Sequence, residues 1–344
     1  MTENNLNIVK LGYRCRQLRW TVATLILGIL SFVLCVSVLL IGNTIYSLDV
    51  ILRVLFGEQV QGATFAIGTI RLPRMLTGFL VGMAFGIAGS TFQTMLRNPL
   101  ASPDIIGISS GSSAAAVFCI VVLKVSGTII SFAAVVAGII VAVLIYALSR
   151  GGRFSGGKLI LIGIGVHAML NAFISFLLLR ASQYDVPGAL IWLNGSLNGM
   201  QMTKIPGLFF VVTIFGFVIF LLGRHIKILE LGEQYAVTLG VRADFTRLLL
   251  ILSAVFLIAY ATAVAGPVAF VAFLAGPIAS KLVGIGAANE LPSGLVGSIL
   301  VLGADLIGQF AFDTRFPVGI ITGILGAPYL LYQLIRLNRT GGSA

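Results

Sequence analysis

The most regular feature of the chain is a series of long apolar runs separated by short polar stretches. Ten runs can be counted in the 344 residues, most of them close to the length that crosses the hydrocarbon core of a bilayer. Backbone groups in lipid must bond to one another, so each run is predicted to be a helix. The third and eighth runs are short or glycine-rich, which leaves a count of nine open. The runs cover residues 20–45, 74–95, 105–123, 127–148, 158–180, 205–222, 246–264, 267–283, 294–311 and 317–335.

The distribution of basic residues sets the topology of these ten helices. With the N-terminus inside, 15 of the 22 Lys and Arg residues fall on the cytoplasmic side, as the positive-inside rule requires. We therefore predict an all-α, multi-pass protein of the cell membrane with both termini cytoplasmic. The seven basic residues left outside are Arg53, Arg71, Arg74, Lys124, Arg180, Lys204 and Arg315.

Composition agrees with this class of protein. Hydrophobic residues make up 58% of the chain and charged residues only 10%, with a mean hydropathy of +1.08. The net charge of +11 follows from the positive-inside bias, so no nucleic-acid partner is expected. No linker or soluble segment interrupts the pattern, so residues 1–344 are predicted to form a single transmembrane domain in contact with lipid.

Candidate chemistry is sparse. The three cysteines are scattered, and only His167 and His225 are available as imidazole ligands, so neither a metal site nor a cofactor is predicted. No group of catalytic carboxylates, serines and histidines shares a face, so no catalytic residue is assigned and the chain is not expected to be an enzyme.

One polar segment, residues 229–241, lies on the predicted cytoplasmic side. Gly232 and Gly240 bracket about two helical turns, and an element this short must lie against something to be stable. We predict that a partner protein that supplies energy binds the chain at this segment. Its candidate residues are Glu230, Glu233, Tyr235, Ala236, Leu239 and Gly240, with Leu231, Tyr235 and Leu239 expected on one face.

A glycine-rich cytoplasmic turn over 151–157 partly matches a phosphate-binding loop. Leu159 stands where Ser or Thr should reach magnesium, and no strand precedes the turn, so a nucleotide site is rejected. Any ATP must therefore be hydrolysed by a partner. We predict instead that Gly152, Gly156 and Gly157 belong to a cytoplasmic gate.

Few polar or close-packing residues occur within the runs. His167 and Asn171 lie four residues apart on one helix face, either as a hydrogen-bonded structural pair or lining a translocation pathway. Asp305 is expected to be an interior hydrogen-bonded group, with a coupling-ion site as the alternative. Gly78, Gly82 and Gly86 repeat every four residues, which favours close internal helix packing over a dimer seam.

Two external stretches are also predicted to be structured. The 46–70 loop carries alternating apolar and charged residues typical of a short helix on the membrane surface. Residues 183–204 are expected to form a broken helix that lines a cavity. The side chains of Arg71, Arg74 and Arg315 have two possible roles. Either they extend toward the membrane–water interface, or they bind acidic residues of an external partner.

The segment RLPRMLTGFLVGMAFGIAGSTFQTMLRNPLASPDIIGISSGSS, residues 71–113, resembles the signature region of the FecCD family of ABC importer permeases. Residues 231–241, 265–284 and 316–336 resemble its cytoplasmic coupling segment, eighth-helix region and last helix. The resemblance covers nearly the whole chain after residue 50. The chain departs from many relatives at Gly276-Pro277, Ser280 and Gln309. These departures affect the assignment of the substrate, not the assignment to this class of permease.

The resemblance implies a ten-helix subunit that pairs with a second permease, identical or not, around a central pathway. Two cytoplasmic ABC ATPase subunits and an extracytoplasmic binding protein are the implied partners. Glu233, Ala236, Leu239 and Gly240 fall on the coupling motif, and Arg71 and Arg74 fall on an external arginine pair, which favours docking. The expected cargo is an iron(III)–siderophore complex, with vitamin B12 or haem as alternatives; an ion-coupled secondary carrier using Asp305 is the alternative from another class.

Overall fold

The computed structural model describes residues 3–103, 107–149, 156–284 and 286–339, without the side chains of residues 3–11, Glu233 and residues 337–339. The described chain is helical and contains no strand. Eight helices within it are long and apolar enough to cross a membrane. They are α1 (Glu3–Leu40), α3 (Leu72–Leu96, continuing the π-helical turn η1, Phe65–Arg71), α5 (Thr128–Ser149), α6 (Gly156–Arg180), α8 (Ile205–Leu221), α11 (Ala243–Ala265), α13 (Glu290–Phe310) and α14 (Val318–Arg339).

The third and eighth predicted runs form shorter helices, α4 (Ile108–Val121) and α12 (Val271–Val283). With 14 and 13 residues they are about 20 Å long, less than the roughly 30 Å of a bilayer core. A helix therefore occurs in each of the ten runs, but two of them fall short of a full span. Non-helical chain at this depth is stable only where protein covers it.

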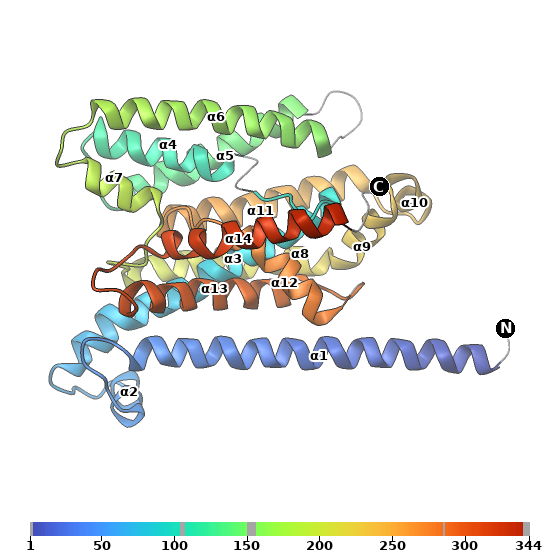
Figure 1. Ribbon diagram of the computed structural model, residues 1–344, viewed down its shortest axis with the longest axis horizontal. Coiled ribbons are helices and arrows are strands. Elements are labelled where there is room, and N and C mark those ends of the chain that lie inside the picture. Colours follow the sequence, from blue (N-terminus) through green and yellow to red (C-terminus); the bar gives the residue numbers. More distant parts are fainter. Residues whose placement is uncertain (1–2, 104–106, 150–155, 285, 340–344) are drawn as a thin grey trace.

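Five further short helices lie at the two ends of the molecule (Figure 1). At one end are α2 (Leu48–Leu55), which confirms a helix in the 46–70 loop, and α7 (Val186–Leu193) in the predicted broken segment. At the other end are α9 (Gly223–Leu231) and α10 (Glu233–Thr238), at the same end of the molecule as the start of α1 and the end of α14. The 3-10 turn η2 (Met202–Lys204) leads into α8.

The buried core is built around α3, which packs against α11, α12 and α13. In its most apolar window 83% of the residues are buried, against 72% for α11 and 67% for α13. A methyl group at Gly82 would overlap the backbone of Gly297 and Ser298, and one at Gly86 would overlap the carbonyl of Ser293. The four-residue glycine repeat therefore serves internal packing, as predicted.

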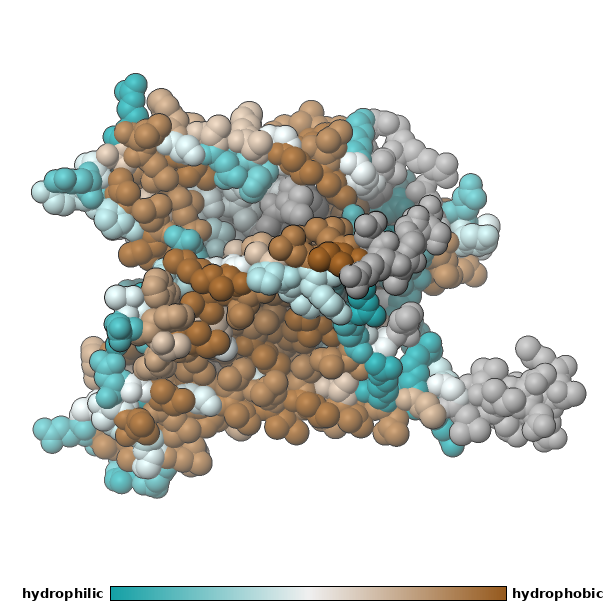
Figure 2. All heavy atoms as spheres, viewed as in Figure 1, coloured by the Kyte–Doolittle hydropathy of each residue, from teal (hydrophilic) through white to brown (hydrophobic). Residues whose placement is uncertain are grey.

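A second group of helices, α4 to α7, lies beside this core (Figure 1). Only 17% of the α6 window and 22% of the α5 window are buried. Figure 2 shows hydrophobic residues across the middle of the molecule and hydrophilic residues mainly at its two ends, as expected of a chain that crosses a bilayer.

Two arginines fasten α1 to the rest of the molecule. Within α1, Arg19 Nε and Nη2 donate to the carbonyls of Leu282 and Lys281 at the end of α12, at 2.9 and 2.8 Å. At the end of α1, Arg71 Nη1 donates to the carbonyls of Leu39 and Leu40, at 2.7 and 3.0 Å. Both guanidinium groups thus satisfy carbonyls at a helix C-terminus, where a cation is favourable.

Candidate functional site

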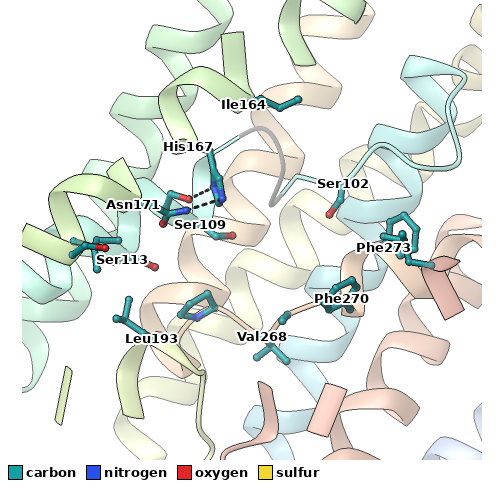
Figure 3. A pocket seen from close by; sticks show the side chains of 16 residues that line it. Ser102, Ser109, Ser113, Ile164, His167, Asn171, Leu193, Val268, Phe270 and Phe273 are labelled. Atoms are coloured by element: carbon teal, nitrogen blue, oxygen red, sulfur yellow. Dashed lines mark hydrogen bonds between the residues drawn. The ribbon is translucent and has the colours of Figure 1, made fainter. Parts of the chain in front are cut away.

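A cavity of about 620 Å³ lies where α4, α6, the chain before α12, and α14 approach one another. Its polar wall consists of serines from α4 together with His167 and Asn171 from α6. Phe270, Phe273 and residues 267–269 form much of the apolar wall. Figure 3 shows the His167 ring beside Asn171, with Phe270 and Phe273 on the other side of the cavity.

The His167 ring is held by two hydrogen bonds. Asn171 Nδ2 lies 2.8 Å from Nε2, and Ser110 Oγ lies 2.5 Å from Nδ1. With the amide nitrogen as donor, Nε2 is the acceptor, so the neutral ring carries its proton on Nδ1 and donates to Ser110. The Ser110 hydroxyl and the Asn171 carbonyl oxygen then remain available to a ligand.

The chemistry of this wall suits ligand binding. No charged side chain lines the cavity in the described part of the chain. Nor does that part contain a group of three His, Cys, Asp or Glu residues able to hold a metal ion. Hydroxyl, amide and imidazole groups facing an apolar wall are typical of a site that orients a ligand by hydrogen bonds.

The cavity exists because the chain is not helical between α11 and α12. Gly266 ends α11 with a φ of 78°, and Phe270 adopts a φ of 63° before α12 begins. Residues 193–197 cross this break closely: the Ser196 amide donates to the Ala265 carbonyl at 2.7 Å, and a side chain at Gly195 would meet Pro267. The predicted broken segment 183–204 therefore does line a cavity, through Leu193.

The 229–241 segment, here called the coupling segment, has the predicted glycine boundaries. Gly232, with a φ of 127°, separates α9 from α10, and Gly240, with a φ of 81°, follows α10. The expected common face of Leu231, Tyr235 and Leu239 is wrong, because the turn at Gly232 places Leu231 on a different helix. Tyr235 and Leu239 are 66% and 61% exposed and Gly240 is also exposed, whereas Ala236 is fully buried.

The α9 part of the segment is tied to the core. Arg97 ends α3 in a left-handed conformation, and its Nη2 donates to the Leu229 carbonyl at 2.5 Å. Lys227 Nζ donates to the Gly286 carbonyl at 3.0 Å. Partial burial raises the pKa of Glu230, and nearby Glu290 adds to this while Lys227 and Arg97 oppose it. Motion of α9 is therefore coupled directly to the end of α3.

The predicted glycine gate is only partly described. Gly152 and the side chain of Glu233 lie outside the described residues. Gly156 and Gly157 are the first residues of α6 rather than part of a turn. A methyl group at Gly156 would lie 2.9 Å from Leu96 Cδ2, so the start of α6 runs close to the end of α3.

The three arginines that the sequence places on the external side all have partners within the chain. Arg71 binds backbone carbonyls near the end of α1 and lies over the Tyr46 ring. Arg74 forms two hydrogen bonds with Asp305, and Arg315 Nη2 donates to Asn43 Oδ1 at 2.8 Å. Only Arg315 is exposed. That the three arginines bind an extracytoplasmic partner stays a prediction. To do so, Arg71 and Arg74 would have to give up their hydrogen bonds within the chain.

Asp305 is the interior hydrogen-bonded group that the sequence favoured. Its side chain is 2% exposed and receives Arg74 Nη2 and Nε at 2.7 and 2.8 Å. Gln309 Nε2 donates to the same carboxylate at 2.8 Å, and Arg74 Nη1 donates to Asn198 Oδ1 at 2.5 Å. The pair joins α3, α13 and the 194–200 segment.

Sequence reasoning missed two features of the site. The serines of α4 were not assigned to the pathway, although the run of serines in 109–113 within an apolar helix was a usable signal. Gly266-Pro267 signals the end of α11, but the left-handed conformation of Phe270 had no signal, because at a bulky residue it is imposed by tertiary packing.

Comparison with known proteins places these features in a family. Residues 24–336 match the model of the FecCD transport family. The chain is 38% identical over 286 residues to the ferric enterobactin transport system permease protein FepG of Escherichia coli (strain K12), covering 83% of this chain and 87% of that protein. It is 36% identical over 331 residues to the achromobactin transport system permease protein CbrC of Dickeya dadantii (strain 3937), covering 94% and 95%.

A solved structure of a metal-chelate type ABC transporter in an inward-facing conformation has the same fold. It aligns with a TM-score of 0.80 and 25% identity, covering 91% of this chain and 99% of that one. The fold, the membrane helices and the match along nearly the whole sequence agree, and the chain belongs to the FecCD transport family.

Proposed function

We propose that the chain is the permease subunit of an ABC importer that carries an iron(III)–siderophore complex across the cell membrane. The observation that carries the proposal is the 620 Å³ cavity, whose neutral polar wall can hydrogen-bond the oxygen atoms of a chelate that already encloses its metal. The names of the related permeases support this cargo. His167 and Asn171 contact the cargo as it passes.

Energy enters through the coupling segment. A cytoplasmic ATPase pair contacts the exposed face of α10, including Tyr235 and Leu239. Since Arg97 and Lys227 tie α9 to the core, movement of α10 displaces the inner ends of the helices as rigid bodies. An extracytoplasmic binding protein delivers the cargo, and a second permease subunit covers the exposed faces of α6 and α14.

An ion-coupled carrier is the competing function. It requires Asp305 to bind a coupling ion, but both oxygens of this carboxylate already accept hydrogen bonds from Arg74. An ion would have to break a buried, bidentate pair, which is costly. Asp305 therefore gives the carrier no support.

The test is uptake by proteoliposomes that contain the chain with its ATPase and binding protein. We expect accumulation of a ferric siderophore that requires internal ATP and survives collapse of the proton and sodium gradients. Tyr235→Ala should abolish uptake while leaving the protein inserted. Uptake without the ATPase would refute the proposal. Accumulation of cobalamin or haem instead of iron chelates would show that the proposed cargo is wrong.

A further inference from the structure

The seven basic residues on the external side differ in what they contact. Six have partners within the described chain: Arg53 with Glu58, Arg71 with backbone carbonyls, Arg74 with Asp305, Lys124 with Asp185, Arg180 over the Phe176 ring, and Arg315 with Asn43. For the Lys204 side chain the described residues supply no hydrogen bond, ion pair or ring contact. This lysine is also half-buried, so its charge is only partly hydrated.

Lys204 lines a second, smaller cavity of about 230 Å³. The cavity lies between the start of α5, α7, the 196–200 segment and the end of α11. No acidic side chain lines it among the described residues. A partly desolvated ammonium group without a counter-charge is unfavourable, so this cavity is suited to receive an anion.

Two neutral donors lie in the same wall. Asn198 Oδ1 accepts a hydrogen bond from Arg74, and a guanidinium can only donate, so the orientation of the amide is fixed and its Nδ2 is left free. Ser196 Oγ accepts the Asn198 amide N–H at 3.1 Å, which leaves the hydroxyl proton free to donate. Ser196 and Asn198 both line the cavity.

The donors and the single charge decide the kind of anion. One ammonium balances one negative charge, whereas a phosphate dianion would bring an uncompensated second charge into a partly buried site. We propose that this outer cavity is a binding site for a carboxylate group, held by Lys204 with Asn198 and Ser196 as hydrogen-bond donors.

The source of the carboxylate rests on the proposed function: it is an arm of an incoming iron chelate. A cavity of 230 Å³ holds one arm rather than a complete complex. Its walls also continue into those of the larger cavity, because Trp192 and Gly266 line the outer one while the next residues, Leu193 and Pro267, line the inner one. The outer site is thus met before the pathway and selects chelates that carry a free carboxylate.

Citrate is a suitable probe, because one of its carboxylate arms can enter the cavity while the other two stay in solvent, and Trp192 in the cavity wall is a suitable reporter. The full chain in phosphatidylcholine nanodiscs is titrated with citrate at constant ionic strength while tryptophan emission is followed. We expect a saturable change that Lys204→Met weakens at least tenfold and that Lys204→Arg largely retains. Trp192→Phe should remove the change, since Trp20, the other tryptophan, bonds to Ala288 at the opposite end.

Arg53→Met is the matched control, because it removes one external positive charge from α2 without touching the cavity. An equal loss with Arg53→Met, or no saturable change in the wild type, would overturn the proposal. Stronger binding of inorganic phosphate than of citrate, or loss of the signal in nanodiscs containing anionic lipid, would overturn the carboxylate assignment and point to phosphate or a lipid headgroup.

The proposed function can fail separately. If the citrate titration behaves as expected but proteoliposomes accumulate no iron chelate, the function is wrong and the site remains. If uptake of ferric siderophore is normal while Lys204→Met leaves the citrate titration unchanged, only the outer site is wrong.

Discussion

Two helices of the same length, α3 and α6, show how differently one apolar pattern can be used. Each has 25 residues and would pass as a membrane span, yet 83% of the α3 window is buried against 17% for α6. The difference lies in glycine placement. Gly78, Gly82 and Gly86 allow the backbone of α13 to touch α3, whereas Gly165 in α6 faces open space.

The polar groups on the two helices differ in the same way. Arg74 at the start of α3 forms a buried ion pair, whereas His167 and Asn171 on α6 face a cavity. From this difference we expect α3 to contribute chiefly to stability and α6 chiefly to function. Three predictions test this division, and a fourth concerns the coupling segment.

The largest effect is expected from overfilling the α3 contact. Gly86→Leu would force a side chain into the Ser293 carbonyl. Because the backbone cannot move aside locally, the loss of folding free energy should exceed the usual cost of overpacking, about 1–3 kcal/mol. Loss of monodisperse protein in gel filtration would report it. Gly165→Leu in α6 is the control and should be tolerated; equal damage there would mean that the α6 face is packed too.

Removing one member of the buried ion pair should come next. Asp305→Asn leaves Arg74 unpaired in a site where its side chain is 11% exposed, at a cost of about 3–5 kcal/mol. Thermal unfolding in detergent measures the loss. Asp185→Asn breaks the exposed pair with Lys124 beside α7 and should change the midpoint little. Similar losses in both variants would contradict the division.

His167→Leu should separate transport from stability. It removes the hydrogen bonds to Ser110 and Asn171 at the cavity wall, and we expect transport to fall roughly tenfold, about 1.4 kcal/mol, with an unchanged unfolding midpoint. Leu179→Ala on the same helix, where the side chain is 87% exposed, serves as the control. A lower midpoint with normal transport would make His167 a structural residue.

The smallest effect concerns pH at the coupling segment. Burial raises the pKa of Glu230 above its usual 4.5, so the folded state holds the proton more tightly than the unfolded state. The contribution to stability is present below pH 4.5 and is lost as pH rises through the raised value. Glu230→Gln should flatten this part of the plot of unfolding midpoint against pH. An unaltered slope would mean that another group causes the pH dependence.

Much of the fold followed from the sequence. The lengths of the apolar runs predicted the helices, and the spacing of Gly78, Gly82 and Gly86 predicted the close internal packing of α3. Gly232 and Gly240 predicted the limits of α10. The pairing of Arg74 with Asp305 was not predictable, because the two residues are 231 positions apart and no periodicity links them. Gly266-Pro267 marks the break after α11, but its extension to the left-handed Phe270 beside the cavity leaves no local pattern.

The arginine ties that hold α1 have an evolutionary consequence. The hydrogen bonds of Arg19 and Arg71 go only to main-chain oxygens, which every amino acid supplies. A change of side chain at residues 39–40 or 281–282 therefore does not remove these hydrogen bonds, whereas substitution of either arginine removes its own bonds in one step, and no second mutation on the acceptor side can restore them.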